Sequence, residues 1–165
     1  MKRHLLAAIF VALSTSAFAQ RPSTDETAVR LGVQEWLSVH SSETGRFDLS
    51  KFKALYRPDL QFTDATTGKT ADARGLGAYT ARLRALTDQV QNYAAVSGDD
   101  LRVLMRGKSA TTSFTFRSQG FYKDGNPITC AGQVNLTWER HDGFWQIARE
   151  ETTPLAVQSE IATTK

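Results

Sequence analysis

Cysteine is nearly absent from this sequence: Cys130 is alone among 165 residues. A lone cysteine cannot form a disulfide within the chain, so the fold is not stabilised by one. We expect a small buried apolar residue here, with a thiol for an intermolecular bridge as the alternative. The sequence also lacks a basic stripe with interleaved aromatic side chains, which argues against nucleic acid as a partner.

Motifs for several common chemistries are missing as well. The sequence has no nucleophile elbow, no glycine-rich phosphate loop and no Cys/His dyad. His40 and His141 have no companion at a spacing useful for metal ligation, so we expect no metal and no cofactor. His40 is expected at the end of the first helix, where a cation complements the helix dipole.

The N-terminus has the three-part pattern of a secretory signal peptide. Lys2 and Arg3 form a positive start, residues 5–13 an apolar segment too short to span a bilayer, and Ala17 and Ala19 precede the expected cleavage site. We therefore expect export to the periplasm or the medium, with no membrane contact after cleavage. An uncleaved anchor is the alternative.

The residues that follow the predicted cleavage site have the size of one domain. We place this domain at residues 20–155 and a C-terminal tail at 156–165. The signal peptide, residues 1–19, contains two of the 20 basic residues, so the remainder nearly balances the 17 acidic ones.

The first half of the domain predicts three helices. Residues 23–26 form a capping box, and apolar residues follow at helical spacing. Asp48 is placed to cap a second, short helix that Pro58 prevents from continuing, and a third helix is predicted over residues 76–88. The apolar sides of the three helices carry Val29, Val33, Trp36 and Leu37; Leu49, Phe52, Leu55 and Tyr56; and Leu76, Tyr79, Leu83 and Leu86.

Strand-like alternation predominates later in the chain. Residues 60–64 predict a short strand and residues 65–75 a polar loop. Four further strands are predicted, with Asp-Gly hairpin signals at 124–125 and 142–143. These four strands cover residues 101–105, 109–122, 128–140 and 144–151. Helices followed by antiparallel strands predict an α+β fold in which the helices cover one face of a curved sheet.

A two-residue turn at residues 142–143 sets the register of the last hairpin. It pairs Leu136 with Arg149 and Val134 with Glu151, so both charged residues are expected on the helix-covered face. That face carries Val134, Leu136, Trp138, Trp145, Ile147, Arg149 and Glu151. The opposite face, expected to meet solvent, carries Gln133, Asn135, Thr137, Glu139, Gln146 and Glu150.

The hairpin at residues 124–125 has two possible registers. A two-residue turn would place Phe114 and Phe116 on the polar face. A three-residue loop with glycine in the left-handed conformation pairs Phe116 with Val134 and Phe114 with Leu136 instead. Matching of apolar residues favours the longer loop, with a bulge as the alternative.

Two segments, residues 47–83 and 134–155, together resemble the nuclear transport factor 2-like superfamily, especially its SnoaL-like and ketosteroid-isomerase-like members. The first segment has an acidic-led second helix ending in "LY", a strand with "F-x-D" and a glycine that opens the third helix. The second has the closing pattern "R-x-DG-x-W-x-I". The motifs are specific for the fold and weak for the activity.

This resemblance implies a cone-shaped barrel of three N-terminal helices packed on a strongly bent, mainly antiparallel sheet, with a pocket open at one end. It also implies a homodimer, which is common among similar proteins. Many members end the last strand with "W-x-I-x-H-x-H", and the histidines enter the cavity. Arg149 and Glu151 occupy the matching positions here, so a mechanism based on those histidines is not implied.

Asp64 is the candidate catalytic residue. A carboxylate in an apolar site suits general-base chemistry; the alternative is an aspartate that bonds its own backbone where a loop begins. Arg149 and Glu151 are expected either to bind an anionic or carbonyl-bearing ligand or to pair with each other. The full set of expected pocket-lining residues is Trp36, Tyr56, Phe62, Tyr79, Phe114, Phe116, Leu136, Trp138, Ile147, Arg149 and Glu151.

Three functions from different classes fit these expectations. The first is a pocket protein that binds a small, partly apolar molecule outside the cytoplasm. The second is a cofactor-free isomerase, cyclase or dehydratase with Asp64 as general base. The third is a protein-association module whose cone is filled. An open pocket with converging polar groups separates the first two from the third.

Overall fold

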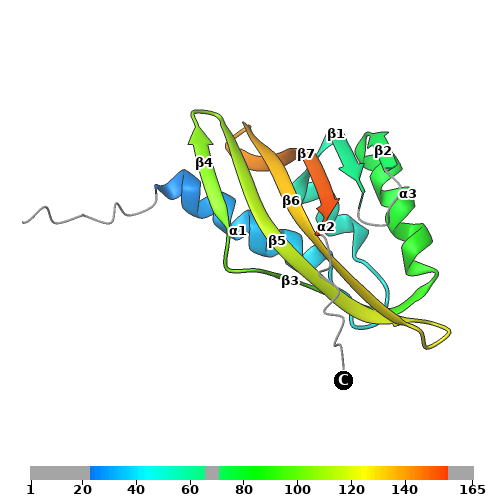
Figure 1. Ribbon diagram of the computed structural model, residues 1–165. Helices are drawn as coiled ribbons and strands as arrows, with labels where there is room; N and C mark the ends of the chain where they lie inside the picture. Colours follow the sequence, from blue (N-terminus) through cyan, green and yellow to red (C-terminus); the bar gives the residue numbers. More distant parts are fainter. Residues whose placement is uncertain (1–22, 66–70, 156–165) are drawn as a thin grey trace, which may run out of the picture.

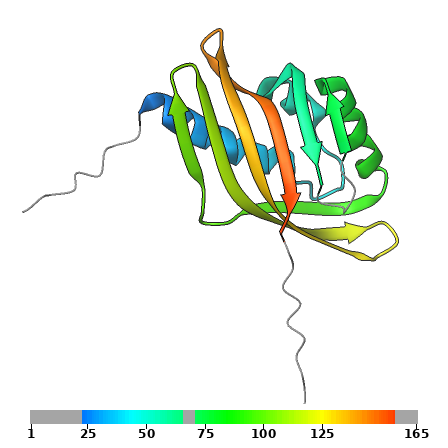
Figure 2. The same ribbon diagram turned by 45° about the horizontal axis from the view of Figure 1, so that its top comes forward.

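Three helices lie on one face of an open, strongly bent sheet of seven strands (Figures 1 and 2). This computed structural model describes residues 23–65 and 71–155, so the predicted signal peptide and C-terminal tail lie outside the described residues. The elements are α1 (Thr24–Val39), α2 (Leu49–Leu55), β1 (Tyr56–Asp64), β2 (Ala71–Arg74), α3 (Leu76–Thr87), β3 (Val90–Ser97), β4 (Arg102–Arg106), β5 (Ser109–Tyr122), β6 (Pro127–His141) and β7 (Phe144–Pro154).

The strand order is β2-β1-β7-β6-β5-β3, and β4 also pairs with β5. Every pairing is antiparallel except that of β1 with β7. The predicted α+β cone with a mainly antiparallel sheet is therefore confirmed. The parallel pairing matters for the site because it brings β1, which follows α2 directly, beside the last strand of the sheet.

The helices begin where the sequence places their caps. The Ser23 hydroxyl accepts a hydrogen bond from the backbone N–H of Glu26 at 3.1 Å, as the capping box predicts. Asp48 caps α2 by accepting from the backbone N–H of Ser50 at 3.1 Å. The third helix starts after Gly75, whose φ of +88° is readily adopted only by glycine.

Three strand boundaries differ from the predictions. β1 begins at Tyr56, before Pro58, because its pairing with β7 is irregular up to Gln61 and no ladder bond there requires the missing N–H of proline. Residues 71–74, predicted as part of a loop, form β2 against the far end of β1. β3 was not anticipated, because only two of its eight side chains are buried and its sequence shows no clear alternation.

The hairpin between β5 and β6 has the predicted three-residue loop, and Gly125 has the left-handed φ of +86°. Phe114 and Phe116 accordingly lie on the covered face and are buried. Their partners differ by two residues from the predicted ones: Phe114 pairs with Val134, and Phe116 pairs with Gly132. A shift of two residues preserves the face of every side chain.

The hairpin between β6 and β7 starts as predicted and then departs from the prediction. Asp142 and Gly143 both have positive φ, 48° and 87°, and form a two-residue turn that pairs Trp138 with Ile147. The next pair is Thr137 with Arg149, so Ala148 is an extra residue, a β-bulge.

This bulge reverses the inside and outside of β7 from residue 149 onward. Leu136 pairs with Glu150 and Val134 pairs with Thr152, so the expected pairings with Arg149 and Glu151 are wrong. Glu150 and Thr152 are buried. The expectation that Glu150 faces solvent is therefore also wrong.

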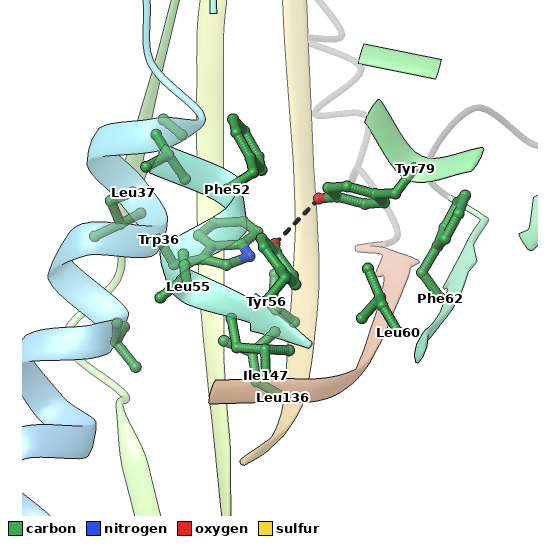
Figure 3. Packing of buried hydrophobic residues seen from close by; sticks show 14 of the residues in the cluster. Trp36, Leu37, Phe52, Leu55, Tyr56, Leu60, Phe62, Tyr79, Leu136 and Ile147 are labelled. Atoms are coloured by element: carbon green, nitrogen blue, oxygen red, sulfur yellow. Dashed lines mark hydrogen bonds between the residues drawn. The ribbon is translucent and has the colours of Figure 1, made fainter. Parts of the chain in front are cut away.

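The core lies between the helices and the concave face of the sheet (Figure 3). Val29 and Val33 of α1 are completely buried, and each contributes on the order of 1.5–3 kcal/mol to folding. Gly32 allows α1 to approach β6 closely, because a Cβ there would lie 2.7 Å from the Trp138 ring. None of the described helices is both long and apolar enough to cross a bilayer.

Candidate functional site

The cone contains a cavity of about 660 Å³, a volume within the usual range for small-molecule sites. Its walls come from α1 and α3 and from β1, β3, β5, β6 and β7 of the sheet. Apolar side chains such as Phe47, Phe62, Leu83, Leu86 and Phe116 line much of it.

Five side chains form what we call the buried polar cluster: Trp36, His40, Tyr56, Tyr79 and Glu150. They come from α1, the start of β1, α3 and β7. All of them except Tyr56 line the cavity. Figure 3 shows the hydroxyls of Tyr56 and Tyr79 pointing toward one another, with the indole nitrogen of Trp36 directed to the same region.

Glu150 is the centre of this cluster, although its side chain is only 5% exposed. Its Oε2 accepts hydrogen bonds from Trp36 Nε1 at 2.8 Å and from the Tyr56 hydroxyl. Its Oε1 is 2.9 Å from the Tyr79 hydroxyl. A carboxylate removed from water requires such partners, because an unpaired buried charge is very costly.

His40 extends the cluster along the end of α1. Its Nδ1 lies 2.7 Å from the carbonyl oxygen of Trp36 and its Nε2 lies 2.6 Å from the hydroxyl of Tyr79. The imidazole also packs on the Trp36 ring, with ring centroids 4.2 Å apart. Both ring nitrogens are therefore engaged within the protein.

Burial shifts the proton affinities of the cluster. Desolvation lowers the pKa of His40 below its ordinary value, although the charge of Glu150 and the bond to Trp36 act in the opposite direction. Desolvation raises the pKa of the Tyr56 and Tyr79 hydroxyls well above their ordinary value, and the charge of Glu150 raises both further. The tyrosines are therefore hydrogen-bond donors or acceptors, and not phenolates, at physiological pH.

Asp64, at the end of β1, also lines the cavity. Arg82 of α3 donates a hydrogen bond to its Oδ2 and forms an ion pair with it. The Arg82 guanidinium also lies 5.9 Å from the centre of the Phe62 ring. This pair is more exposed than Glu150, so the cavity has one deeply buried polar region and one nearer to solvent.

The expectation that Arg149 and Glu151 point into the pocket is wrong. The bulge at Ala148 places both side chains on the outer face, where they are 54% and 38% exposed. They form an ion pair with each other, which was the alternative to a ligand role. An exposed pair of this kind contributes little to stability.

The other expected pocket residues fall into two groups. Trp36, Phe62, Tyr79 and Phe116 line the cavity. Tyr56, Phe114, Leu136, Trp138 and Ile147 are buried in the packed core and do not line it.

Sequence reasoning missed Glu150 and the role of His40. The available signal was the presence of three side chains with N–H or O–H groups on the apolar sides of the predicted helices: Trp36, Tyr56 and Tyr79. Buried tryptophan and tyrosine usually find a hydrogen-bond partner, so three of them facing the sheet predict an acceptor there. The bulge that brings Glu150 to that position has no comparable sequence signal.

Cys130 is partly buried and lies on the cavity wall. Within residues 23–65 and 71–155, no three His, Cys, Asp or Glu side chains gather in an arrangement that could hold a metal ion.

No known family model matches the sequence, and no curated protein is similar to it. Solved structures, however, share its fold. A proposed aromatic ring hydroxylase from Novosphingobium aromaticivorans has a TM-score of 0.73 at 17% identity, over 83% of this chain and 93% of that one. A proposed scytalone dehydratase from the same species has a TM-score of 0.68 at 15% identity, over 80% and 85% of the two chains.

A nuclear transport factor 2-like superfamily protein from Salmonella enterica has a TM-score of 0.68 at 14% identity, over 84% of this chain and 96% of that one. At such low identity, the comparisons establish architecture and carry no residue roles. They show that this chain has the nuclear transport factor 2-like fold that its sequence motifs suggested.

Proposed function

We propose that this protein binds a small, partly apolar molecule inside its cone. The observation that carries the proposal is the cavity of about 660 Å³, which has apolar walls and two separate polar regions. Binding sites for small molecules combine these features, because apolar area supplies affinity and a few placed polar groups fix orientation. A protein-association module with a filled cone would have packed side chains in this space.

The catalytic alternative relied on Asp64 as a general base. Arg82 is hydrogen-bonded to that carboxylate, so the ion pair would have to open or rearrange before Asp64 could act on a ligand. A proton-transfer role for Asp64 remains a prediction. Its test is whether Asp64→Asn abolishes turnover of a ligand once one is identified.

The binding proposal can be tested by mass spectrometry of small molecules retained by the purified native protein. Leu86→Trp places a larger side chain on the cavity wall, whereas Leu31→Trp makes the same change on the exposed side of α1. We expect the Leu86→Trp protein to lose the retained mass and the Leu31→Trp protein to keep it. Equal retention by both variants, with both folded, would contradict binding in the cone.

Export and dimerisation remain proposals that rest on the sequence. The signal-peptide pattern supports cleavage after Ala19, and N-terminal sequencing of protein recovered outside the cytoplasm tests it. The outer face of β6 and β7 is polar, so we propose only a homodimer of modest stability. Light scattering at high concentration would detect it.

A further inference from the structure

The hydrogen atoms of the buried polar cluster determine which ligand groups it can accept. Trp36 Nε1 and the Tyr56 hydroxyl each carry a single hydrogen, and both donate to Glu150 Oε2. His40 Nδ1 faces a backbone carbonyl oxygen at 2.7 Å. Because a carbonyl can only accept, Nδ1 carries a hydrogen that is used within the protein.

The remaining hydrogens lie along the line from His40 through Tyr79 to Glu150. Tyr79 has one hydroxyl hydrogen, but its oxygen is within hydrogen-bond distance of both His40 Nε2 and Glu150 Oε1, at 2.6 and 2.9 Å. Both contacts are satisfied if His40 Nε2 is protonated and Tyr79 donates to the carboxylate. If His40 is neutral, its Nε2 can instead accept the Tyr79 hydrogen, and that hydrogen again stays within the cluster.

In both arrangements, every polar hydrogen of the cluster points at another cluster atom or at the Trp36 carbonyl. The cluster therefore has no hydrogen left for a ligand. It does have acceptor capacity, because Glu150 Oε1 has one partner, Tyr79, among the described residues, and a carboxyl oxygen has two lone pairs. Glu150 lines the cavity, so a ligand there can approach its carboxyl group.

We propose that the buried polar cluster selects ligands that bring a neutral hydroxyl group, carried on a flat apolar ring, to Glu150 Oε1. This inference rests on the proposed binding function and specifies its ligand class. A ligand carbonyl or carboxylate oxygen at the same position would lose its hydrogen bonds to water and find no donor in the cluster. It would also lie against the Glu150 oxygen, which is itself an acceptor. Aromatic side chains on the cavity wall, among them Phe62 and Phe116, suit a planar ring.

Glu150→Gln gives a direct test because it changes the acceptor into a donor. The glutamine oxygen can replace Oε2, which receives two hydrogen bonds. Its NH₂ group then replaces Oε1, donates one hydrogen to Tyr79 and turns the other toward the cavity. Glu151→Gln is the matched control, because it makes the same change at the neighbouring residue on the outer face.

The probes are 2-naphthol and 2-methoxynaphthalene, which share a ring system and an oxygen but differ in the hydroxyl hydrogen. Their dissociation constants are measured by titration calorimetry for the full mature chain and for both variants, after circular dichroism has shown that each is folded. We expect the wild-type protein and the Glu151→Gln protein to prefer 2-naphthol at least tenfold. In the Glu150→Gln protein the preference should fall below twofold or reverse.

Equal binding of the two probes to the wild-type protein would overturn this inference and leave the proposed binding function standing. An unchanged preference in a folded Glu150→Gln protein would also overturn it. If neither probe binds the wild-type protein, the inference fails, whereas the proposed binding function is decided separately by the masses that the Leu86→Trp and Leu31→Trp proteins retain. The wild-type preference decides the matter even where the Glu150→Gln protein does not fold.

Discussion

Tyr79→Phe is the substitution that tests the buried polar cluster most directly. It removes one oxygen atom that lies 2.6 Å from His40 Nε2, 2.9 Å from Glu150 Oε1 and 3.2 Å from the Tyr56 hydroxyl. The ring itself packs among Phe52, Tyr56 and Phe62, and phenylalanine preserves that packing. Any loss of stability therefore reports on the hydroxyl.

The expected loss of stability follows from His40 and Glu150, the two partners that lose a hydrogen bond to the Tyr79 hydroxyl. A hydrogen bond to a charged group contributes about 1.5–3 kcal/mol and a neutral one about 0.5–1.5 kcal/mol. His40 and Glu150 both line the cavity, so water can replace part of what is lost. We expect the free energy of unfolding to fall by about 2–4 kcal/mol, or the melting temperature by roughly 6–12 °C for a domain of this size.

The assay is urea unfolding followed by circular dichroism, with Tyr122→Phe as the control. Tyr122 also lines the cavity, but its hydroxyl makes no hydrogen bond with the described part of the chain, so its loss should cost less than about 0.5 kcal/mol. If Tyr79→Phe were no more destabilising than Tyr122→Phe, the cluster would not be formed in solution as described.

Two further predictions concern pH and the outer face. Burial lowers the pKa of His40, so the folded protein favours the neutral imidazole. The contribution of His40 to stability should therefore be fully present above about pH 6.5 and be lost as the pH falls through the folded-state pKa. Over that range the free energy of unfolding should fall by at most about 1.4 kcal/mol per pH unit. The ionisable side chains packed around His40 are Glu150, Tyr56 and Tyr79. Between pH 5 and 8, the melting temperature should depend less on pH in His40→Gln than in the wild-type protein, and the exposed His141→Gln should not change this dependence. Arg149→Ala should change the free energy of unfolding by no more than about 1 kcal/mol and leave ligand retention intact, because its pair with Glu151 is exposed; a loss of binding would place Arg149 in the site after all.

The fold could be predicted because each local signal agrees with the tertiary structure. The Ser23 and Asp48 caps, the apolar sides of three helices and the left-handed glycine at 125 each act over a few residues and need no long-range information. β2 and β3 could not be predicted in the same way. They are strands because neighbouring strands offer hydrogen bonds, and not because their own side chains alternate between core and solvent.

The site was only partly predictable, and the reason is a single residue. Strand alternation carries a face assignment along a chain only while pairing is regular, and the bulge at Ala148 exchanges the two faces. Without the bulge, Arg149 and Glu151 would enter the cone and Glu150 would leave it. Residues 149–151, "REE", place charged side chains on both faces of the strand in either register. Their composition therefore does not distinguish the regular register from the bulged one.

The hydrogen-bond donors that face Glu150, from α1, α3 and the start of β1, explain why the bulged register is adopted. In a regular register, Trp36 and Tyr56 would face an arginine, which can only donate, and their buried hydrogens would lose the acceptor that Glu150 provides. The bulge costs local strand pairing, but it places one carboxyl group where three donors converge and leaves Arg149 and Glu151 to pair at the surface. The position of Glu150 is thus determined by residues from α1, α3 and β1. The same convergence uses up the hydrogens of the cluster and leaves an acceptor facing the cavity.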